Sequence, residues 1–278
     1  MIDYLTGLFS YEFMRNALLA GVLVSVACGI VGTLVVLNRI VFISGGIAHA
    51  AYGGVGIAYY AGIDPVLGAI GFSLISSLAM GLVHRRARQR SDTVIGVMWS
   101  IGMAIGIIFV SLSPGYKADL MSYLFGSILA VSTRDLWLML AIAVLVLVFV
   151  AVFYRLLLSI SFDETFSTVR NLPVGLLYLA MVTLIGLTVV ISMRVVGLIM
   201  VIALLTIPPA IANLFLKDMR GIMILSVVLS MVFCVAGLLL SYTLNLPSGA
   251  VIILVAGMAY VLAAVIKQVK SNNRIQTA

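Results

Sequence analysis

Residues 136–153 read LWLMLAIAVLVLVFVAVF, eighteen consecutive residues without a charged side chain. An α-helix rises 1.5 Å per residue, so about 20 such residues cross the hydrocarbon core of a bilayer, which is about 30 Å thick. A segment this apolar is expected to be helical, because a helix satisfies its own backbone hydrogen bonds in lipid. This stretch therefore predicts a transmembrane helix, which we place at residues 135–157.

Similar apolar runs recur along the chain, which has 278 residues, 64% of them hydrophobic and only 9% charged. A soluble domain carries roughly a quarter charged residues, so most of this surface is expected to face lipid. The short alternating segments of a membrane β-barrel are absent from the sequence. We expect an all-α, polytopic transmembrane bundle, with residues 1–278 as a single domain and a polar cytoplasmic tail at 268–278.

The apolar runs predict nine spans, with eight as the alternative. The second span is short and rich in glycine, and the seventh contains Pro208–Pro209, where a straight helix cannot continue. Residues 123–132 (YLFGSILAVS) are apolar but too short to cross a bilayer, so they predict a half-helix packed against protein. The predicted spans are residues 13–37, 47–62, 65–83, 94–112, 135–157, 173–192, 195–213, 221–243 and 249–267.

Lysine and arginine residues gather in alternate loops, and this asymmetry predicts the orientation of the chain. The richest loop, residues 84–90, reads HRRARQR. If the basic loops are cytoplasmic, nine spans place the N-terminus outside and the C-terminus inside. The net charge of +7 is then a topology signal, and no nucleic-acid partner is expected.

His49 is the exception among the ionisable residues, because the acidic residues fall at loops or helix ends whereas His49 lies within the second predicted span. An ionisable group at membrane depth suggests a functional site, and neutral imidazole binds zinc, manganese and iron. The alternative is a histidine near the interface that bonds a neighbouring helix. Gly53 and Gly54 suit a helix that lines a translocation path, and they equally suit close packing. The Tyr52 hydroxyl is a further candidate to line such a path.

Motifs for enzymatic chemistry are missing from the sequence. It has no G-x-x-x-x-G-K-[ST] phosphate loop and no H-E-x-x-H zinc motif. No paired carboxylates lie within a predicted span to perform acid–base chemistry. We therefore predict that the chain is not an enzyme and that any ATP hydrolysis takes place on another chain. The lack of buried carboxylates also weakens an ion-coupled carrier.

Six segments, taken in order, resemble the integral-membrane permeases of ATP-binding-cassette (ABC) importers for zinc, manganese and iron(II), whose fold is that of a type II ABC importer permease. The resemblance covers nearly the whole chain. The segments are residues 15–21 (RNALLAG), 44–50 (SGGIAHA), 92–96 (DTVIG), 124–129 (LFGSIL), 162–164 (FDE, followed by NLP at 171–173) and 196–212 (VGLIMVIALLTIPPAIA).

This resemblance implies a complex in the cell membrane of a prokaryote. Two copies of the permease would combine with two cytoplasmic ABC ATPase subunits and an extracytoplasmic metal-binding protein. The chain would bind no cofactor, and its cargo would be a divalent transition metal. Alternating access would move the metal past His49, with Pro208, Pro209, Gly53 and Gly54 as flexing points. The residues expected to couple to the ATPase are Asn213, Lys217, Asp218, Met219, Arg220, Asp163 and Glu164.

One position departs from the family pattern, which usually has an acidic residue four positions before the histidine. Here that position is Gly45. Manganese and iron favour oxygen ligands more than zinc does, so we expect zinc as the cargo ahead of manganese and iron. The partner of His49 is then Ser44, Tyr52, His49 of the partner subunit, a backbone carbonyl or water, or else the path has no defined site. Two other classes stay open: an ion-coupled secondary transporter without an ATPase, and a non-transporting membrane scaffold.

Overall fold

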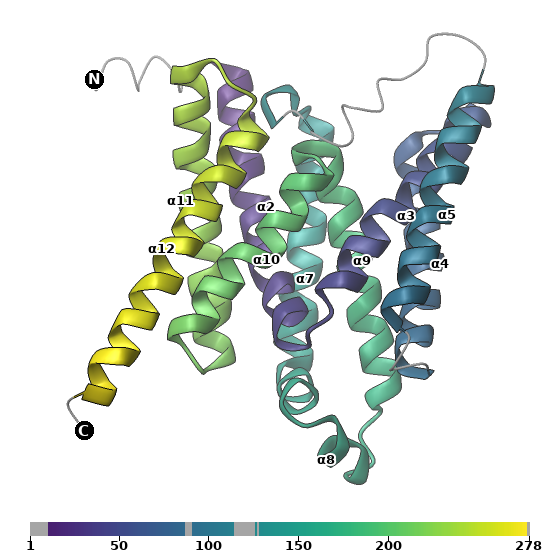
Figure 1. Ribbon diagram of the computed structural model, residues 1–278. Helices are drawn as coiled ribbons and strands as arrows, with labels where there is room; N and C mark the ends of the chain where they lie inside the picture. Colours follow the sequence, from purple (N-terminus) through teal and green to yellow (C-terminus); the bar gives the residue numbers. More distant parts are fainter. Residues whose placement is uncertain (1–10, 87–90, 114–125, 127, 277–278) are drawn as a thin grey trace.

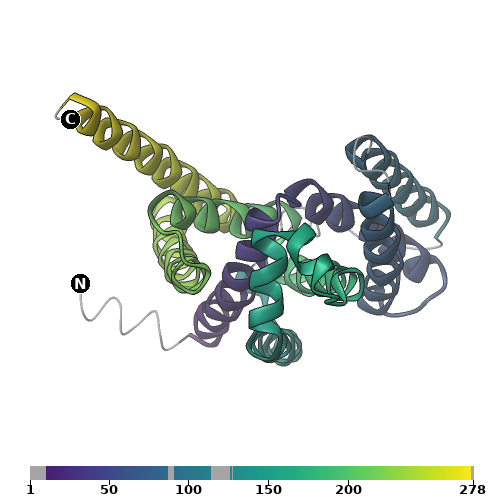
Figure 2. The same ribbon diagram turned by 90° about the horizontal axis from the view of Figure 1, so that it is seen from below.

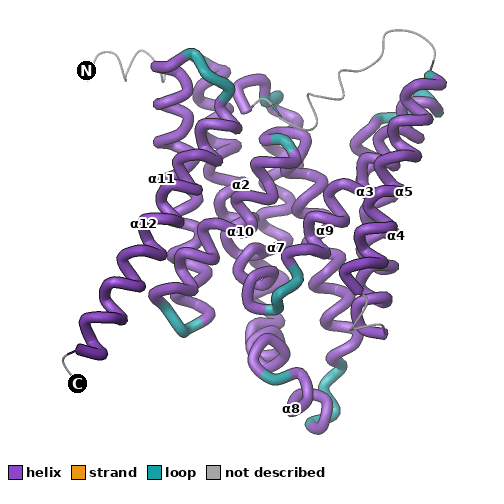
Figure 3. The backbone as a smooth tube through the Cα atoms, viewed as in Figure 1, coloured by secondary structure: helices purple, strands orange, loops and turns teal. Residues whose placement is uncertain are grey.

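The computed structural model of the chain describes residues 11–86, 91–113, 126 and 128–276, and Figure 3 shows this part as helices joined by short loops. No strand occurs among these residues. Nine of the described helices are long and apolar enough to cross a membrane, which confirms the predicted bundle and favours nine spans over eight. They are α2 (Glu12–Leu37), α3 (Val41–Tyr60), α4 (Pro65–Arg86), α5 (Ser91–Leu112), α7 (Thr133–Phe162), α9 (Val174–Val196), α10 (Leu198–Phe215), α11 (Met219–Leu244) and α12 (Ser248–Gln276). Two shorter helices are η1 (Ile128–Ala130) and α8 (Glu164–Val169).

Some predicted features fall outside the described residues. These are residues 87–90 of the basic cluster, residues 123–125 and 127 of the 123–132 segment and the last two residues of the tail. The rest of the predicted tail continues α12 as far as Gln276, so the last span and the tail form one helix over the described part.

α2 lies at the centre of the bundle, where it packs against α7, α10 and α11 (Figure 1). α3, α4 and α5 form a second group, which α4 joins to the centre by packing on α9. α12 contacts α10 and α11 and then extends away from the bundle, as the view from below in Figure 2 shows. The bundle thus has a packed centre, with the three-helix group on one side and α11 and α12 on the other.

α2 carries hydroxyl side chains that are fully buried. Ser25 Oγ donates to the backbone carbonyl four residues earlier at 2.6 Å, and Thr33 Oγ1 does the same at 2.8 Å. Both hydroxyls also reach α11, where Cys234 Sγ lies 3.6 Å from Ser25 Oγ and Ser226 Oγ lies 3.4 Å from Thr33 Oγ1. Each hydroxyl therefore makes its shorter hydrogen bond within α2 and a longer contact with α11, a helix far along the chain.

The turn between α2 and α3 lies earlier than predicted, because α3 begins at Val41 rather than at residue 47. The chain turns at Arg39, whose φ of 57° is left-handed, and the Asn38 side chain donates to the backbone carbonyl four residues earlier at 2.8 Å. Gly45 and Gly46 are consequently helical. The predicted span, which starts at residue 47, leaves the glycine pair outside the helix, whereas Gly46 is helical and is needed for packing, since a Cβ there would lie 2.6 Å from a side-chain carbon of α5.

α3 packs against α4 and α5 through glycines on facing surfaces. A Cβ at Gly53 would lie 2.8 Å from the Gly102 carbonyl oxygen of α5, and a Cβ at Gly54 would overlap the Gly68 carbonyl of α4. The three helices therefore touch backbone to backbone, as small residues permit within membranes. Close packing accounts for Gly53 and Gly54, and a flexing role for them stays a prediction.

α10 continues as a helix through Pro208 and Pro209, so the pair does not end the helix. Each proline lacks an N–H, and together they leave the carbonyls of Leu204 and Leu205 without their helical donors. The Leu205 carbonyl instead faces Gly32 of α2, where any side chain would overlap it. The close approach of α2 thus covers one freed carbonyl. Flexing at the proline pair stays a prediction.

The turn between α9 and α10 is a single residue, Gly197, with φ 82° and ψ 154°. This conformation is readily adopted only by glycine. Gly126, with φ 65°, lies against the backbone of Gly197, and η1 follows it with Ile128 only 2% exposed. The described end of the 123–132 segment is therefore a short 3₁₀ turn packed against α2 and α9, as expected for apolar residues that do not cross the membrane.

Candidate functional site

His49 lies on α3, and the helix itself holds its ring. Nδ1 lies 2.8 Å from the backbone carbonyl oxygen of Gly45, one turn earlier. A carbonyl oxygen only accepts, so Nδ1 carries the proton and Nε2 carries the lone pair. A hydrogen bond of this kind fixes the tautomer and orientation of a histidine that binds a metal. The arrangement therefore leaves Nε2 with the free lone pair that a metal ligand requires.

Trp99 of α5 covers one face of the His49 ring. The two ring centroids are 3.9 Å apart and the planes are 30° apart, which is a stacked arrangement. Trp99 is held in turn by its Nε1–H, which donates to Met103 Sδ at 3.1 Å, and by Phe42, whose ring centroid lies 6.1 Å away. The sequence analysis missed Trp99 because the contact joins two helices, and no spacing within one sequence pairs them.

The other candidate ligands on α3 are more deeply buried than His49, which is half-buried. Ser44 is 1% exposed, and its Oγ donates to the carbonyl of Val41 at 2.8 Å. Tyr52 is 3% exposed and packs beside Gly106 of α5. The structure therefore leaves the His49 imidazole as the most accessible of the three predicted ligands.

Gly45 provides open space beside His49. It lies four residues earlier, on the same face of α3, and a Cβ added to it would meet no atom within 4 Å. Among the residues that the structure describes, no group of three or more His, Cys, Asp or Glu side chains could hold a metal ion. One chain thus offers a single imidazole next to an unfilled space, which is an incomplete set of metal ligands.

The residues predicted to couple to an ATPase lie at the α8 end of the bundle, at the bottom of Figure 1. Asp163 caps α8, its Oδ1 accepting from the backbone N–H of Phe166 at 2.9 Å, and Glu164 is the first residue of that helix. Asp218 caps α11 in the same way, its Oδ2 accepting from the backbone N–H of Gly221 at 3.0 Å.

The segment after Pro209 consists of the last turns of α10, which ends at Phe215, and a short turn before α11, rather than a separate helix. Asn213 and Lys217 are exposed there, whereas Met219 is 0% exposed and packs in the core. The Arg220 guanidinium lies 4.5 Å from the centroid of the Tyr154 ring of α7. Of this segment, the α10–α11 turn and its exposed side chains are open to a partner, and Met219 is not.

α8 is a separate helix that the sequence analysis did not predict. It projects beyond the neighbouring helix ends (Figure 1) and, with the end of α7, exposes three large apolar side chains. Phe162 is 68% exposed, Phe166 is 55% exposed and Val169 is 76% exposed. Apolar side chains exposed together at and beyond the end of a span indicate a surface that contacts a protein partner or the membrane.

The opposite end of the bundle is fixed by ion pairs. Arg194 Nε of α9 lies 3.2 Å from Asp135 Oδ1, and that carboxyl also completes a capping box with Ser132 at the start of α7. Arg134 lies 3.4 Å from Asp64 in the turn between α3 and α4. These contacts tie α7 to α9 and to the three-helix group, and they hold the carboxylates at the helix ends.

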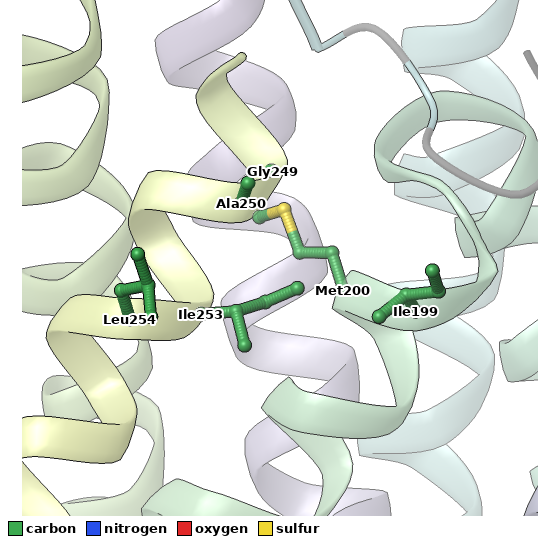
Figure 4. Close-up of a pocket in the computed structure, with 6 residues that line it drawn as sticks. All are labelled: Ile199, Met200, Gly249, Ala250, Ile253 and Leu254. Atoms are coloured by element: carbon green, nitrogen blue, oxygen red, sulfur yellow. The ribbon is translucent and has the colours of Figure 1, made fainter. Parts of the chain in front are cut away.

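A hollow of about 290 Å³ between α10 and α12 is lined by apolar residues (Figure 4). Met200 points from α10 toward Ala250 of α12, with Ile253 beside it. No polar groups converge there to orient a substrate, so we interpret the hollow as imperfect packing between two helices. His49 stays the better candidate site.

The sequence as a whole matches one family profile. The profile of the ABC 3 transport family matches residues 10–267. An uncharacterized membrane protein of Synechocystis sp. is 55% identical over 263 residues, which cover 95% of this chain and 94% of the relative. The manganese transport system membrane protein MntC of Listeria monocytogenes is 34% identical over 260 residues, which cover 94% of this chain and 92% of MntC.

Two solved structures share the fold. PsaBC from Streptococcus pneumoniae, in complex with Fab, superposes with a TM-score of 0.84 at 30% identity and covers 95% of each chain. A putative metal-chelate type ABC transporter in an inward-facing conformation superposes with a TM-score of 0.71 at 15% identity, covering 95% of this chain and 89% of that chain. The second likeness concerns the fold alone.

Proposed function

The chain belongs to the ABC 3 transport family, and we propose that it is the permease of an ATP-driven importer that carries zinc into the cytoplasm. His49 is the observation that supports this path, because its Nε2 lone pair is presented within a membrane span by the bond between Nδ1 and the Gly45 carbonyl. The names of two relatives, MntC and the manganese import system permease protein ScaB of Streptococcus gordonii, make manganese the competing cargo, with iron(II) a third.

Zinc is placed first because of the ligands that α3 offers. Imidazole nitrogen suits zinc, whereas manganese prefers carboxylate oxygen, and the family's acidic position is Gly45 here. A single imidazole binds weakly, which suits a conduit that must release its cargo. A second copy of the chain would add a second His49 to the same path.

The proposed complex has a second copy, two ATPase subunits and an extracytoplasmic metal-binding protein. A second copy would lie on the side of α3, α10 and α12, where α12 extends away from the bundle and leaves exposed apolar flanks such as Leu254 and Leu262 (Figure 2). The ATPase would sit at the α8 end, which makes that end cytoplasmic and the N-terminus external. ATP hydrolysis and its energy then belong to the partner chain.

The proposed function is tested by reconstituting the permease, the ATPase and the binding protein in vesicles. ATP-dependent accumulation of zinc, manganese and iron(II) is measured separately, and zinc is expected to accumulate fastest. Accumulation by the permease alone, driven by an ion gradient, would instead show a secondary transporter. A complex that assembles and accumulates no metal would show a scaffold.

Replacing Gly45 by aspartate is expected to shift the cargo preference toward manganese. The open space at Gly45 admits a side chain, and its carboxylate would lie one turn before His49 on the same face of α3. Manganese uptake relative to zinc uptake, measured by metal analysis of the vesicles, should rise. The isosteric Gly45→Asn is the control without charge, and an equal rise in that variant would contradict the explanation.

Replacing Phe166 by alanine is expected to weaken association with the ATPase. The side chain is 55% exposed on α8, so its loss should change the stability of the permease by less than about 0.5 kcal/mol. An aromatic anchor at an interface contributes about 2 kcal/mol or more, which is about 30-fold in affinity. Co-purification of the ATPase and metal-stimulated ATP hydrolysis measure the effect.

Phe13→Ala is the matched control for Phe166→Ala. Phe13 is also exposed, at 42%, but it lies in the first turn of α2 at the opposite end of the bundle. Retention of the ATPase by both variants would move the docking surface away from α8 and toward the end of α10, with Asn213, and the α10–α11 turn, with Lys217 and Asp218.

A further inference from the structure

A groove of about 610 Å³ runs along the side of the bundle between α2, α7 and α11. Figure 2 shows α7 and α11 beside the central helix α2, whereas α3 belongs to the three-helix group on the other side. The walls of the groove are apolar apart from two residues, Tyr154 and Arg220, which lie together at one end. The groove is therefore separate from the proposed metal path and has an apolar body with one cationic end.

The cationic end lies at the depth of lipid headgroups. Tyr154 is 22 residues after Ser132, the N-cap of α7, which corresponds to about 33 Å along a helix and so to about one bilayer thickness. Arg220 stands in the first turn of α11, and its guanidinium lies 4.5 Å from the Tyr154 ring centroid. Tyrosine and arginine at this depth are typical of the membrane interface.

The body of the groove requires a hydrocarbon occupant. Water is unfavourable there, because a bound water needs two or more polar partners and the walls offer almost none. On α11 the lining runs from Arg220 to Met231, eleven residues or about 16 Å, along one helix face. This length and shape suit an extended acyl chain that lies parallel to α11.

The Arg220 guanidinium is free to bind an anion. Among the described residues it forms no ion pair. The nearest acidic residue in sequence, Asp218, uses Oδ2 to accept the backbone N–H of Gly221 at 3.0 Å. A guanidinium presents five N–H donors in a geometry that matches a phosphate, and the stacked Tyr154 ring leaves its edge available.

We propose that this groove is a binding site for an anionic phospholipid of the leaflet at the α8 end. One acyl chain lies between α2, α7 and α11, and the lipid phosphate binds Arg220 above the Tyr154 ring. The site depends on the membrane alone and does not require the permease to carry any particular metal. Its failure would therefore leave the proposed transport function unaffected.

Native mass spectrometry of the purified full-length chain tests the site. The chain is incubated with equal amounts of phosphatidylglycerol and phosphatidylcholine that have identical acyl chains, and retained lipid is counted. Phosphatidylglycerol is expected to be retained in preference. Arg220→Gln should lower this preference about fivefold, the contribution of one arginine beside an anionic headgroup. Inorganic phosphate should not displace the lipid, because it does not fill the groove.

Two further variants distinguish lipid binding in the groove from a general effect of positive charge on the protein. Arg170→Gln is the matched control, because Arg170 also stacks on an aromatic ring, at 5.2 Å from the Phe166 centroid, but lies outside the groove. It should keep the wild-type preference. Ala151→Phe fills the groove and should reduce retention of both lipids without lowering the melting temperature.

Three results would overturn the proposal. The first is equal retention of the two lipids by the unmodified chain, and the second is an equal loss of preference in Arg170→Gln. The third is occupation of the groove by a second copy, shown by disulfide crosslinking between two chains that carry Val228→Cys.

Discussion

Replacement of His49 by alanine is expected to lower metal uptake by at least about tenfold. Even loss of a hydrogen-bond partner to a metal-ligating histidine costs about 10- to 100-fold in metal affinity or activity, and this change removes the ligand itself. The ring packs against Trp99 at the surface of α3 rather than within the core, so the bundle should still fold. Uptake of radioactive zinc into vesicles that contain the assembled complex measures the effect.

The other histidine of the chain provides the control. His84 lies in the last turn of α4, and its ring stacks on Tyr178 of α9 at 6.0 Å rather than on Trp99. His84→Ala should retain uptake, and both variants should retain ATPase association. Uptake that is unchanged in His49→Ala for zinc, manganese and iron(II) would remove His49 from the path and leave it as a packing residue.

The second large effect is expected from Gly54→Val, which should prevent α3 from packing. A Cβ at Gly54 would overlap the Gly68 carbonyl and lie 2.5 Å from Phe72 Cβ, both on α4. Neither neighbour is the flexible end of a side chain, so the helices must separate. Overpacking of this kind costs about 3 kcal/mol and occasionally more. Size-exclusion chromatography and the melting temperature in detergent measure the loss.

Gly71→Val separates packing from helix propensity. Gly71 also lies within a membrane helix, α4, but a Cβ there would meet nothing within 4 Å. This variant should fold as well as the unmodified protein. If the two variants had equal melting temperatures, the backbone contact between α3 and α4 would not be what stabilises the three-helix group.

The number and order of the spans could be predicted from the sequence because each depends on a local property, about 20 apolar residues in a row. The residue at which α3 begins could not be predicted in this way. Glycine is common at helix ends, and the prediction started the second span at residue 47, after Gly45 and Gly46. In this bundle the break lies at Arg39, and the glycine at position 46 serves contact with α5.

The candidate site was less predictable than the fold, because its geometry depends on contacts between helices. His49 was identified from its residue type and depth, and its role in transport stays a prediction. Trp99 carried no signal in the sequence, since only the packing of α5 on α3 brings it to the imidazole. α8 was missed because six residues are too few for a helical pattern to stand out. The burial of Met219 in the core could not be predicted either, because its neighbours in the sequence are polar.

The hydroxyls of α2 have a consequence for the order in which the protein is made. α2 is the first described span to leave the ribosome, yet the α11 residues that meet Ser25 and Thr33 are synthesised roughly 200 residues later. In the interval these hydroxyls face lipid or transient neighbours, where an unbonded polar group costs several kcal/mol. Because each hydroxyl already donates to a carbonyl of its own helix, α2 can stay in the bilayer without that cost until α11 is inserted. The same side chains are thus compatible with insertion of α2 into the bilayer on its own and, later, with its packing against α11.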